Sequence, residues 1–194
     1  MISVCVRNVD YIWIGVTCDE QHIFSTCFGP SRQEALKSLL DGLPFNVPFQ
    51  VLPEPTAFAE TALATVKYIY DGKGASRGVP FAMEHLSAYT RRVLEVTALI
   101  PVGYVAFYGG VAEATGGSAR AVGNVMARNP FAPVVPCHRV ICSDFTLGGY
   151  GGGLGMKLRL LEREKRGHKS SREIAVGERK LRVYPVESVL SKLN

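Results

Sequence analysis

Apolar and polar positions alternate in short blocks at the start of the chain. Three short apolar runs lie between residues 2 and 28, and polar breaks at 8–10 and 19–21 separate them. Runs of this length, rich in β-branched and aromatic residues and bounded by turn-forming residues, are typical of strands. The pattern therefore predicts a three-stranded meander.

The apolar spacing then changes to the period of a helix. Ser31 and Glu34 form a capping box ahead of an apolar stripe, and Gly42 ends the predicted helix. The proline-rich segment 43–56 is expected to be a loop or an edge strand, and a second helix is predicted over 57–70. Together with the meander, these helices predict an α/β domain.

The glycine-rich stretch 72–80 is expected to be an exposed loop or a domain linker. We place the boundary there. The prediction is an N-terminal α/β supporting domain over 1–79, a second domain over 80–167 and a C-terminal extension over 168–194.

The second domain is predicted to be mainly helical. Apolar spacing indicates helices over 83–99, 108–115 and 118–128, and Ser118 is a good N-cap for the last of these. The short helices on either side of the Gly116-Gly117 turn have the order of a helix-turn-helix.

The extension beyond residue 167 is basic. Residues 174–176 and 181–184 are expected to pair as a hairpin, followed by a short helix over 185–193. Two roles stay open: the extension covers the domain, or it enlarges the basic surface.

Charge and composition narrow the function classes. The chain of 194 residues has a net charge of +5 and a pI near 9.0, which permits nucleic-acid binding without requiring it. It contains neither a long apolar segment nor a basic-plus-apolar signal at its start, so we expect a soluble cytoplasmic protein with no membrane partner.

The five cysteines are an odd and sparse set, which argues against a secreted disulfide framework. Cys5, Cys18 and Cys27 with His22 match no compact metal motif, so we expect no bound metal. A disulfide among these three cysteines stays open.

The predicted helix 118–128 carries two parallel rows of residues. One row has almost no side-chain bulk and the other is polar. The small row is Ala119, Gly123 and Ala127; the polar row is Arg120, Asn124 and Arg128. A smooth row lets a helix approach another surface closely, and that surface is either a packed helix or a DNA groove.

A cysteine sits at a predicted corner between two apolar runs. Cys137 follows Pro136 and precedes His138, and the pairs 134–135 and 140–141 are predicted to be short buried strands. A neighbouring base can convert a thiol to a nucleophilic thiolate. The alternative is a buried structural cysteine beside a satisfied histidine.

A glutamate lies on the apolar face of the next predicted helix, 156–166. Glu164 falls near the middle of the apolar arc, where a carboxylate is costly unless it is paired. Pairing with His138 would give the order nucleophile, base and orienting group; pairing with an arginine would be purely structural. Lys157 and Lys165 fall in the same arc, and we expect their long stems to reach out to solvent.

The run Pro136-Cys137-His138-Arg139-Val140 resembles the active-site signature of the O6-alkylguanine-DNA alkyltransferases. The resemblance covers roughly residues 87–167. Further motifs occur in the family's order at Gly103, Tyr108, 118–123, Met126, 128–130, 148–154, Lys157 and Glu164.

The resemblance implies a fold and an activity. The fold is a ribonuclease-H-like N-terminal domain followed by a winged-helix-like helix-turn-helix domain. The activity is direct-reversal DNA repair, in which an alkyl group moves irreversibly from O6-alkylguanine in double-stranded DNA to Cys137. His138 would be the base, Glu164 its orienting group and Tyr108 the proton donor, with no cofactor, in a monomer.

The resemblance also implies how DNA and base are held. The helix 118–128 would lie in the minor groove, and Arg120 would fill the gap left by a flipped guanine. The pocket would be formed by Tyr150, the Gly151 amide and the carbonyls of Cys137 and Val140. Asn129 would tie the recognition helix to the active-site turn. The family more often has serine at the position of Gly151, but a backbone donor survives that change.

Two other function classes stay open. A DNA-binding module that senses alkyl lesions without chemistry would need no nucleophile, so Cys137 argues against it. A thiol hydrolase of the Cys-His kind would turn over, but it leaves the helix-turn-helix unexplained. The glycine run 148–155 has neither the third glycine of a dinucleotide loop nor the Lys-Ser or Lys-Thr of a P-loop, so it is expected to be a flexible pocket wall.

Overall fold

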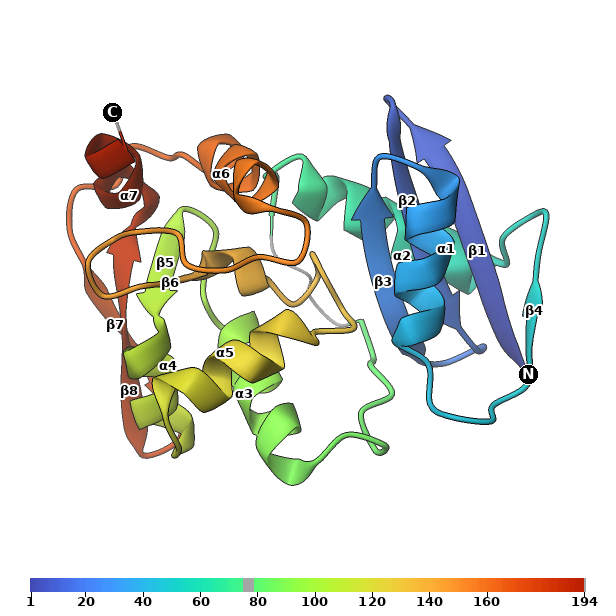
Figure 1. Ribbon diagram of the computed structural model, residues 1–194, viewed down its shortest axis with the longest axis horizontal. Helices are drawn as coiled ribbons and strands as arrows, with labels where there is room; N and C mark the ends of the chain where they lie inside the picture. The colour runs from blue at the N-terminus through green and yellow to red at the C-terminus, as the bar shows by residue number, and fades with distance from the viewer. Residues whose placement is uncertain (75–78, 194) are drawn as a thin grey trace. The chain divides into compact units, whose positions relative to one another are not determined.

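The computed structural model describes residues 1–74 and 79–193, which form two compact units (Figure 1). Part of the predicted linker, 75–78, lies outside the described residues. The first unit contains residues 1–70, 79–86 and 129–134, and the second contains the rest of the described chain. This division differs from the predicted second domain, 80–167, at 80–86 and 129–134, and from the predicted first domain, 1–79, at 71–74.

The first unit is built on a four-stranded sheet in the order β3-β2-β1-β4. Its strands are β1 (Ile2–Val9), β2 (Ile12–Cys18), β3 (Ile23–Gly29) and β4 (Phe49–Val51). The first three strands are antiparallel neighbours, which confirms the meander, and the proline-rich segment supplies β4 as a parallel edge strand.

Helices α1 (Arg32–Asp41) and α2 (Ala57–Tyr70) cover opposite faces of this sheet (Figure 1). The Ser31 side chain accepts a hydrogen bond from the Glu34 amide, and Gly42 is the C-cap of α1, both as predicted. Close packing of α1 depends on Gly15 in β2, because a Cβ there would lie 2.7 Å from Leu39 Cδ1.

The second unit contains the remaining helices. They are α3 (Ala88–Ala98), α4 (Tyr108–Thr115), α5 (Ala119–Ala127), α6 (Leu154–Arg163), α7 (Val186–Leu193) and the 3-10 turn η1 (Cys137–Arg139). The helix-turn-helix prediction agrees with α4 and α5, and Ser118 caps α5 by accepting from the Ala121 amide. Helix α3 starts later than predicted because Ser87 caps it, accepting from the Thr90 amide. Within the described chain, every helix is too short or too polar to cross a bilayer.

A second four-stranded sheet, in the order β6-β5-β8-β7, corrects the prediction of a mainly helical unit. Its strands are β5 (Tyr104–Phe107), β6 (Val140–Ile141), β7 (Arg172–Val176) and β8 (Arg179–Pro185). Strand β5 is four apolar residues without alternation, so periodicity gives no signal for it. The predicted strand at 134–135 is wrong. These residues lie between Pro133 and Pro136, which lack the N–H that a sheet ladder requires.

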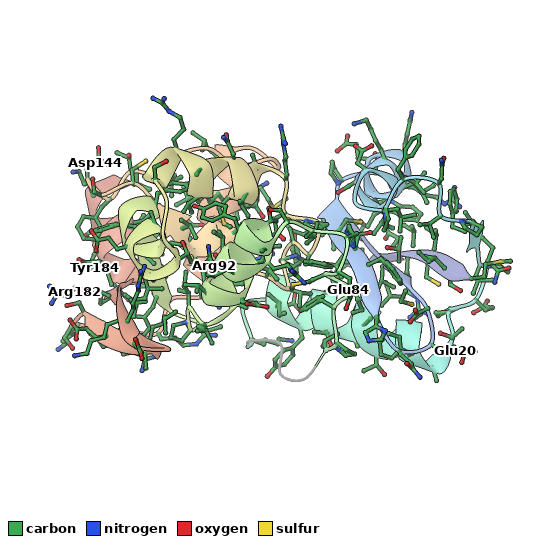
Figure 2. All side chains as sticks on the ribbon, turned by 90° about the horizontal axis from the view of Figure 1, so that it is seen from below. Glu20, Glu84, Arg92, Asp144, Arg182 and Tyr184 are labelled. Carbon is green, nitrogen blue, oxygen red and sulfur yellow. The ribbon has the colours of Figure 1, made fainter. Side chains whose placement is uncertain are left out.

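The C-terminal extension is part of the core of the second unit. The predicted hairpin and final helix are confirmed as β7, β8 and α7, and β8 pairs with β5. The rings of Tyr184 and Phe107 stack at 4.3 Å, whereas Arg182 on the same strand projects outward (Figure 2). Helix α7 shares one buried apolar cluster with β5, β6 and α6. Its members are Val105, Ile141, Leu147, Leu161, Val186 and Val189. Of the two roles left open, covering the domain is thus observed.

We expect Leu181→Ala in β8 to lower the free energy of unfolding by about 2–5 kcal/mol, because it leaves a cavity beneath the sheet. Leu181 is fully buried, and its neighbour Lys180 is exposed. Chemical denaturation of the whole protein measures the effect, with Lys180→Ala as the matched control. Equal small losses in both variants would contradict an extension that belongs to the core.

Candidate active site

Cys137 is the first residue of η1, so the predicted corner is a single 3-10 turn. The Cys137 amide donates to the Val135 carbonyl at 2.8 Å, and the Arg139 amide donates to the Pro136 carbonyl at 2.9 Å. The turn breaks the extended alternation that would have placed adjacent side chains on opposite faces. Cys137 is 6% exposed and His138 is fully buried.

The Cys137 side chain borders a pocket of about 700 Å3 in the second unit. Its walls come from η1, the start of α4, one face of α5, the turn after β6 and the glycine-rich segment before α6. The lining residues are Tyr108, Gly109, Ala119, Gly123, Met126, Ala127, Cys137, Cys142, Ser143, Gly149, Tyr150 and Gly151. The small-residue row of α5 and the cysteine thus share one cavity.

Behind the pocket lies a buried cluster of His138, Arg139 and Glu164. His138 Nε2 donates to Glu164 Oε1 at 2.8 Å, and Arg139 donates to both carboxylate oxygens at 2.8 Å. All three residues are at most 1% exposed. The two partners considered for Glu164, a histidine and an arginine, therefore both bind it.

The cluster sets the protonation of its members. Burial alone would raise the pKa of Glu164, but the charges of His138 and Arg139 and the hydrogen bonds from both lower it to about 2. Burial lowers the pKa of His138 below its ordinary value, although Glu164 opposes the shift. His138 is therefore a neutral imidazole beside an ionised carboxylate.

Lys157 does not reach solvent, so that prediction is wrong. Its ammonium is fully buried and donates to the carbonyls of Val140 and Leu147 at 2.6 Å each and of Gly149 at 3.3 Å. Burial lowers the pKa of Lys157 to about 8, with the charges of nearby cysteines opposing. Backbone acceptors compensate the cost of burying this cation. Lys165 is exposed, as expected.

Two tyrosines flank the cysteine. Burial, together with the charges of Cys142 and Cys137, raises the pKa of Tyr108 to about 12. Burial, the Cys137 charge and a hydrogen bond to Cys137 hold the pKa of Tyr150 well above its ordinary range. Both hydroxyls therefore keep their protons at neutral pH. Gly148, at φ +66°, allows the Tyr108 ring to approach, since a Cβ there would lie 3.0 Å from Tyr108 Cε2.

Seven of the fourteen predicted site residues line this pocket, and His138 and Glu164 belong to the buried cluster behind it. Arg120, Asn124 and Arg128 are exposed on the polar row of α5. Val140 is not a lining residue, and its carbonyl accepts from Lys157. Asn129 belongs to the first unit, where its Oδ1 accepts from the Phe131 amide.

Sequence reasoning missed several residues of the site. Cys142 and Ser143 line the pocket, and Arg139 holds Glu164. The signal for Arg139 was a charge inside an otherwise apolar run. The signal for Lys157 was a cation within the apolar arc of α6.

The remaining cysteines belong to the first unit and do not line the pocket. Cys5, Cys18 and Cys27 are buried thiols, and Cys27 Sγ donates to the Ala35 carbonyl of α1. Burial raises the pKa of Cys18 and of Cys27 to about 12. Such thiols are poor nucleophiles at neutral pH.

Comparisons with known proteins place this chain among characterised relatives. Residues 88–166 match the family model described as 6-O-methylguanine DNA methyltransferase, DNA binding domain. A methylated-DNA–protein-cysteine methyltransferase of Mycobacterium leprae is 44% identical over 119 residues, which are 59% of this chain and 69% of that relative. The chain belongs to the methylated-DNA–protein-cysteine methyltransferase family. A family member from Methanothermobacter thermautotrophicus is 53% identical over 76 residues, 39% of this chain, so the match spans less than half, 43%, of that relative.

Solved structures of the methyltransferase family have a similar fold. The crystal structure of O6-methylguanine-DNA methyltransferase from Pyrococcus kodakaraensis is 30% identical, with a TM-score of 0.63, covering 84% of this chain and 99% of that one. Mycobacterium tuberculosis OGT in complex with DNA is 25% identical, with a TM-score of 0.65, covering 84% and 92%.

The lowered pKa of Glu164 predicts acid sensitivity. Because the folded pKa of about 2 lies below the ordinary 4.5, this carboxylate stabilises the fold above pH 4.5, and the contribution is lost as pH falls toward 2. The shift corresponds to a loss on the order of 3 kcal/mol. Denaturation of wild type and Glu164→Gln at each pH should show a gap that narrows across this window; a constant gap would contradict the ion pairing.

Proposed function

We propose that this protein repairs DNA by moving an alkyl group from O6-alkylguanine in a duplex to Cys137 Sγ, once per molecule. The observation that carries the proposal is the shared cavity, in which the thiol and the small-residue row of α5 face the same space. A row without bulk lets a helix approach DNA closely, and the cavity beside it has room for an extruded base. The similarity to Mycobacterium tuberculosis OGT in complex with DNA supports DNA as the partner.

On the DNA side, α5 lies in the minor groove, and its small row faces the sugar edges. O6 of guanine is inside the duplex, so the nucleotide must be flipped out before a thiol can reach it. Arg120 is exposed at the first turn of α5, next to the pocket-lining Ala119, and it fills the vacated place in the base stack. Asn124 and Arg128 hold the backbone.

The chemistry follows from the protonation states of the site. His138 accepts the Cys137 proton at Nδ1 through a water molecule, while Glu164 holds Nε2–H. The thiolate attacks the alkyl carbon, an S–C bond forms, and the C–O6 bond breaks with its electron pair going to guanine. Tyr108, still protonated, gives its proton to the guanine and regains one from solvent, as His138 releases its own. The thioether is a poor leaving group, so the protein is consumed, and no cofactor is needed.

The base is held by the pocket walls. Tyr150 lines one wall, and the Gly151 amide is exposed there as a donor to O6. Carbonyl oxygens have two lone pairs, so the Val140 carbonyl can serve both Lys157 and the exocyclic amine of guanine. The Cys137 carbonyl is a second acceptor, and Asn129 fixes the chain between the recognition helix and the active-site turn.

Finer points of architecture belong to the same proposal. We infer a ribonuclease-H-like fold for the first unit, the supporting domain, and a winged-helix-like fold for the second unit, the DNA-binding domain. Strands β7 and β8 of the extension, 168–194, would be the wing. The protein acts as a monomer in the cytoplasm. A lesion sensor without chemistry is the second candidate, and the nucleophile at the pocket argues against it.

We expect wild-type protein mixed with a duplex containing one O6-methylguanine to gain a single methyl group. Peptide mapping should place it on Cys137, because this pocket-lining thiol is adjacent to the proposed base His138 in η1. Cys137→Ser should lose transfer but still bind the duplex, and Cys27→Ser, which changes a remote buried thiol, should keep transfer.

Methyl transfer by Cys137→Ser would refute the assigned nucleophile. Tight binding of the modified duplex by wild type with no mass gain would favour the sensor. Continuous turnover would favour a hydrolase instead.

Arg120→Ala should slow transfer from duplex DNA by at least about tenfold, because flipping costs a few kcal/mol without the replacing side chain. Transfer from the free base O6-methylguanine should be unchanged, since nothing is flipped. Arg159→Ala, which removes the same charge from the exposed side of α6, is the control. Equal loss with free base and duplex would contradict a flipping role.

A further inference from the structure

All three nitrogens of the buried Arg139 guanidinium donate hydrogen bonds within the second unit. Nε donates to Glu164 Oε2 and Nη2 to Glu164 Oε1, both at 2.8 Å, while Nη1 donates to the Ile100 carbonyl at 2.6 Å. The side chain is 1% exposed. No solvent-facing part of this cation is left to bind DNA or substrate, so its role lies within the cluster.

The ionised Glu164 places a negative charge next to the His138 ring, and Arg139 balances that charge. A buried carboxylate next to an imidazole strongly favours the doubly protonated, positive form of the ring. In that form His138 has no lone pair and cannot take a proton from Cys137. Arg139 supplies the compensating positive charge and leaves His138 a single bond to Glu164 Oε1. That bond fixes Nε2 as the protonated nitrogen.

This arrangement leaves Nδ1, the second nitrogen of the His138 ring, without a proton. Nδ1 of His138 is buried and has no hydrogen-bond partner among the described residues. A buried polar atom without a partner is costly and uncommon in folded proteins. An unprotonated Nδ1 is therefore available as an acceptor for a proton that arrives through water.

We propose that Arg139 is a positioning residue that neutralises Glu164 and so keeps His138 a neutral base with Nδ1 free to accept the Cys137 proton. The proposal rests on the proposed alkyl transfer and deepens it. Without Arg139, Glu164 would still hold the ring in place but would shift it toward the protonated form, against the effect of burial.

The other charges near His138 act in known directions. Burial and the charges of Arg139 and Lys157 lower the pKa of His138, and Glu164 raises it through its charge and hydrogen bond. Lys157 is on α6, and its ammonium donates to the carbonyls of Val140 and Leu147. Loss of Arg139 therefore removes one charge that lowers the pKa of His138, while Glu164 still raises it.

The test is an NMR titration of the His138 ring in the full protein, assigned by its absence in His138→Gln. Arg139→Met should raise the pKa of His138 by about one unit or more. The acid limb of the pH profile for transfer from free O6-methylguanine should move upward, with a fall in rate of up to about tenfold per unit at pH values below both pKa values. Arg159→Gln, which changes net charge equally on the exposed side of α6, should leave both unchanged.

A double variant separates charge from packing. Arg139→Met with Glu164→Gln removes both charges, so His138 should return to the neutral form at pH 7, whereas damaged packing would not be repaired. An unshifted His138 in Arg139→Met, or no reversal in the double variant, overturns the proposal.

Wild-type protein gives a further decision if Arg139→Met does not fold. A His138 ring that carries two protons at pH 6.5 overturns the proposal, and a neutral ring there meets its first requirement. Absence of methyl transfer by wild type would refute the proposed function, but the titration would still decide the role of Arg139.

Discussion

The second unit depends on one buried carboxylate and the three hydrogen bonds that it accepts. Glu164 is the C-cap of α6, and its partners His138 and Arg139 belong to η1. Arg139 in turn binds the carbonyl of Ile100, just beyond α3. One ionised group thus joins three separate parts of the chain. Breaking one partner of a buried pair is far more damaging than exchanging the whole set for apolar groups, because a lone buried charge is left behind. The same bonds that hold the fold also set the protonation of the histidine.

Elements with a local signal could be predicted from the sequence. Helices α1, α2, α4 and α5 have clear apolar spacing and N-terminal caps or glycine stops, and the meander has turn residues between its strands. Parts of the candidate site could be predicted where reactive residues are adjacent in the sequence, as at Cys137 and His138. Glu164 was found because a carboxylate on an apolar helix face needs a partner.

What could not be predicted depends on contacts between distant parts of the chain. Strand β5 is too short for a period and is defined by its pairing with β6 and β8. Lys157 looked like a residue that reaches solvent, and only the carbonyls of Val140 and Leu147, brought together by folding, make burial acceptable. Periodicity indicated that Glu164 needs either a histidine or an arginine as its partner. It did not indicate that both bind, because that arrangement depends on the curvature of the 3-10 turn η1.

The cavity is wide because glycines form so much of its surface. Gly109, Gly123, Gly149 and Gly151 all line it, and a Cβ placed on any of them would meet no other atom within 4 Å. At these four positions, therefore, no side-chain contact limits the width of the cavity. Under the proposed function, the range of alkyl groups that fit the cavity is then an adjustable property. Single side chains at these positions can narrow the chamber stepwise, while the buried cluster of His138, Arg139 and Glu164 stays untouched.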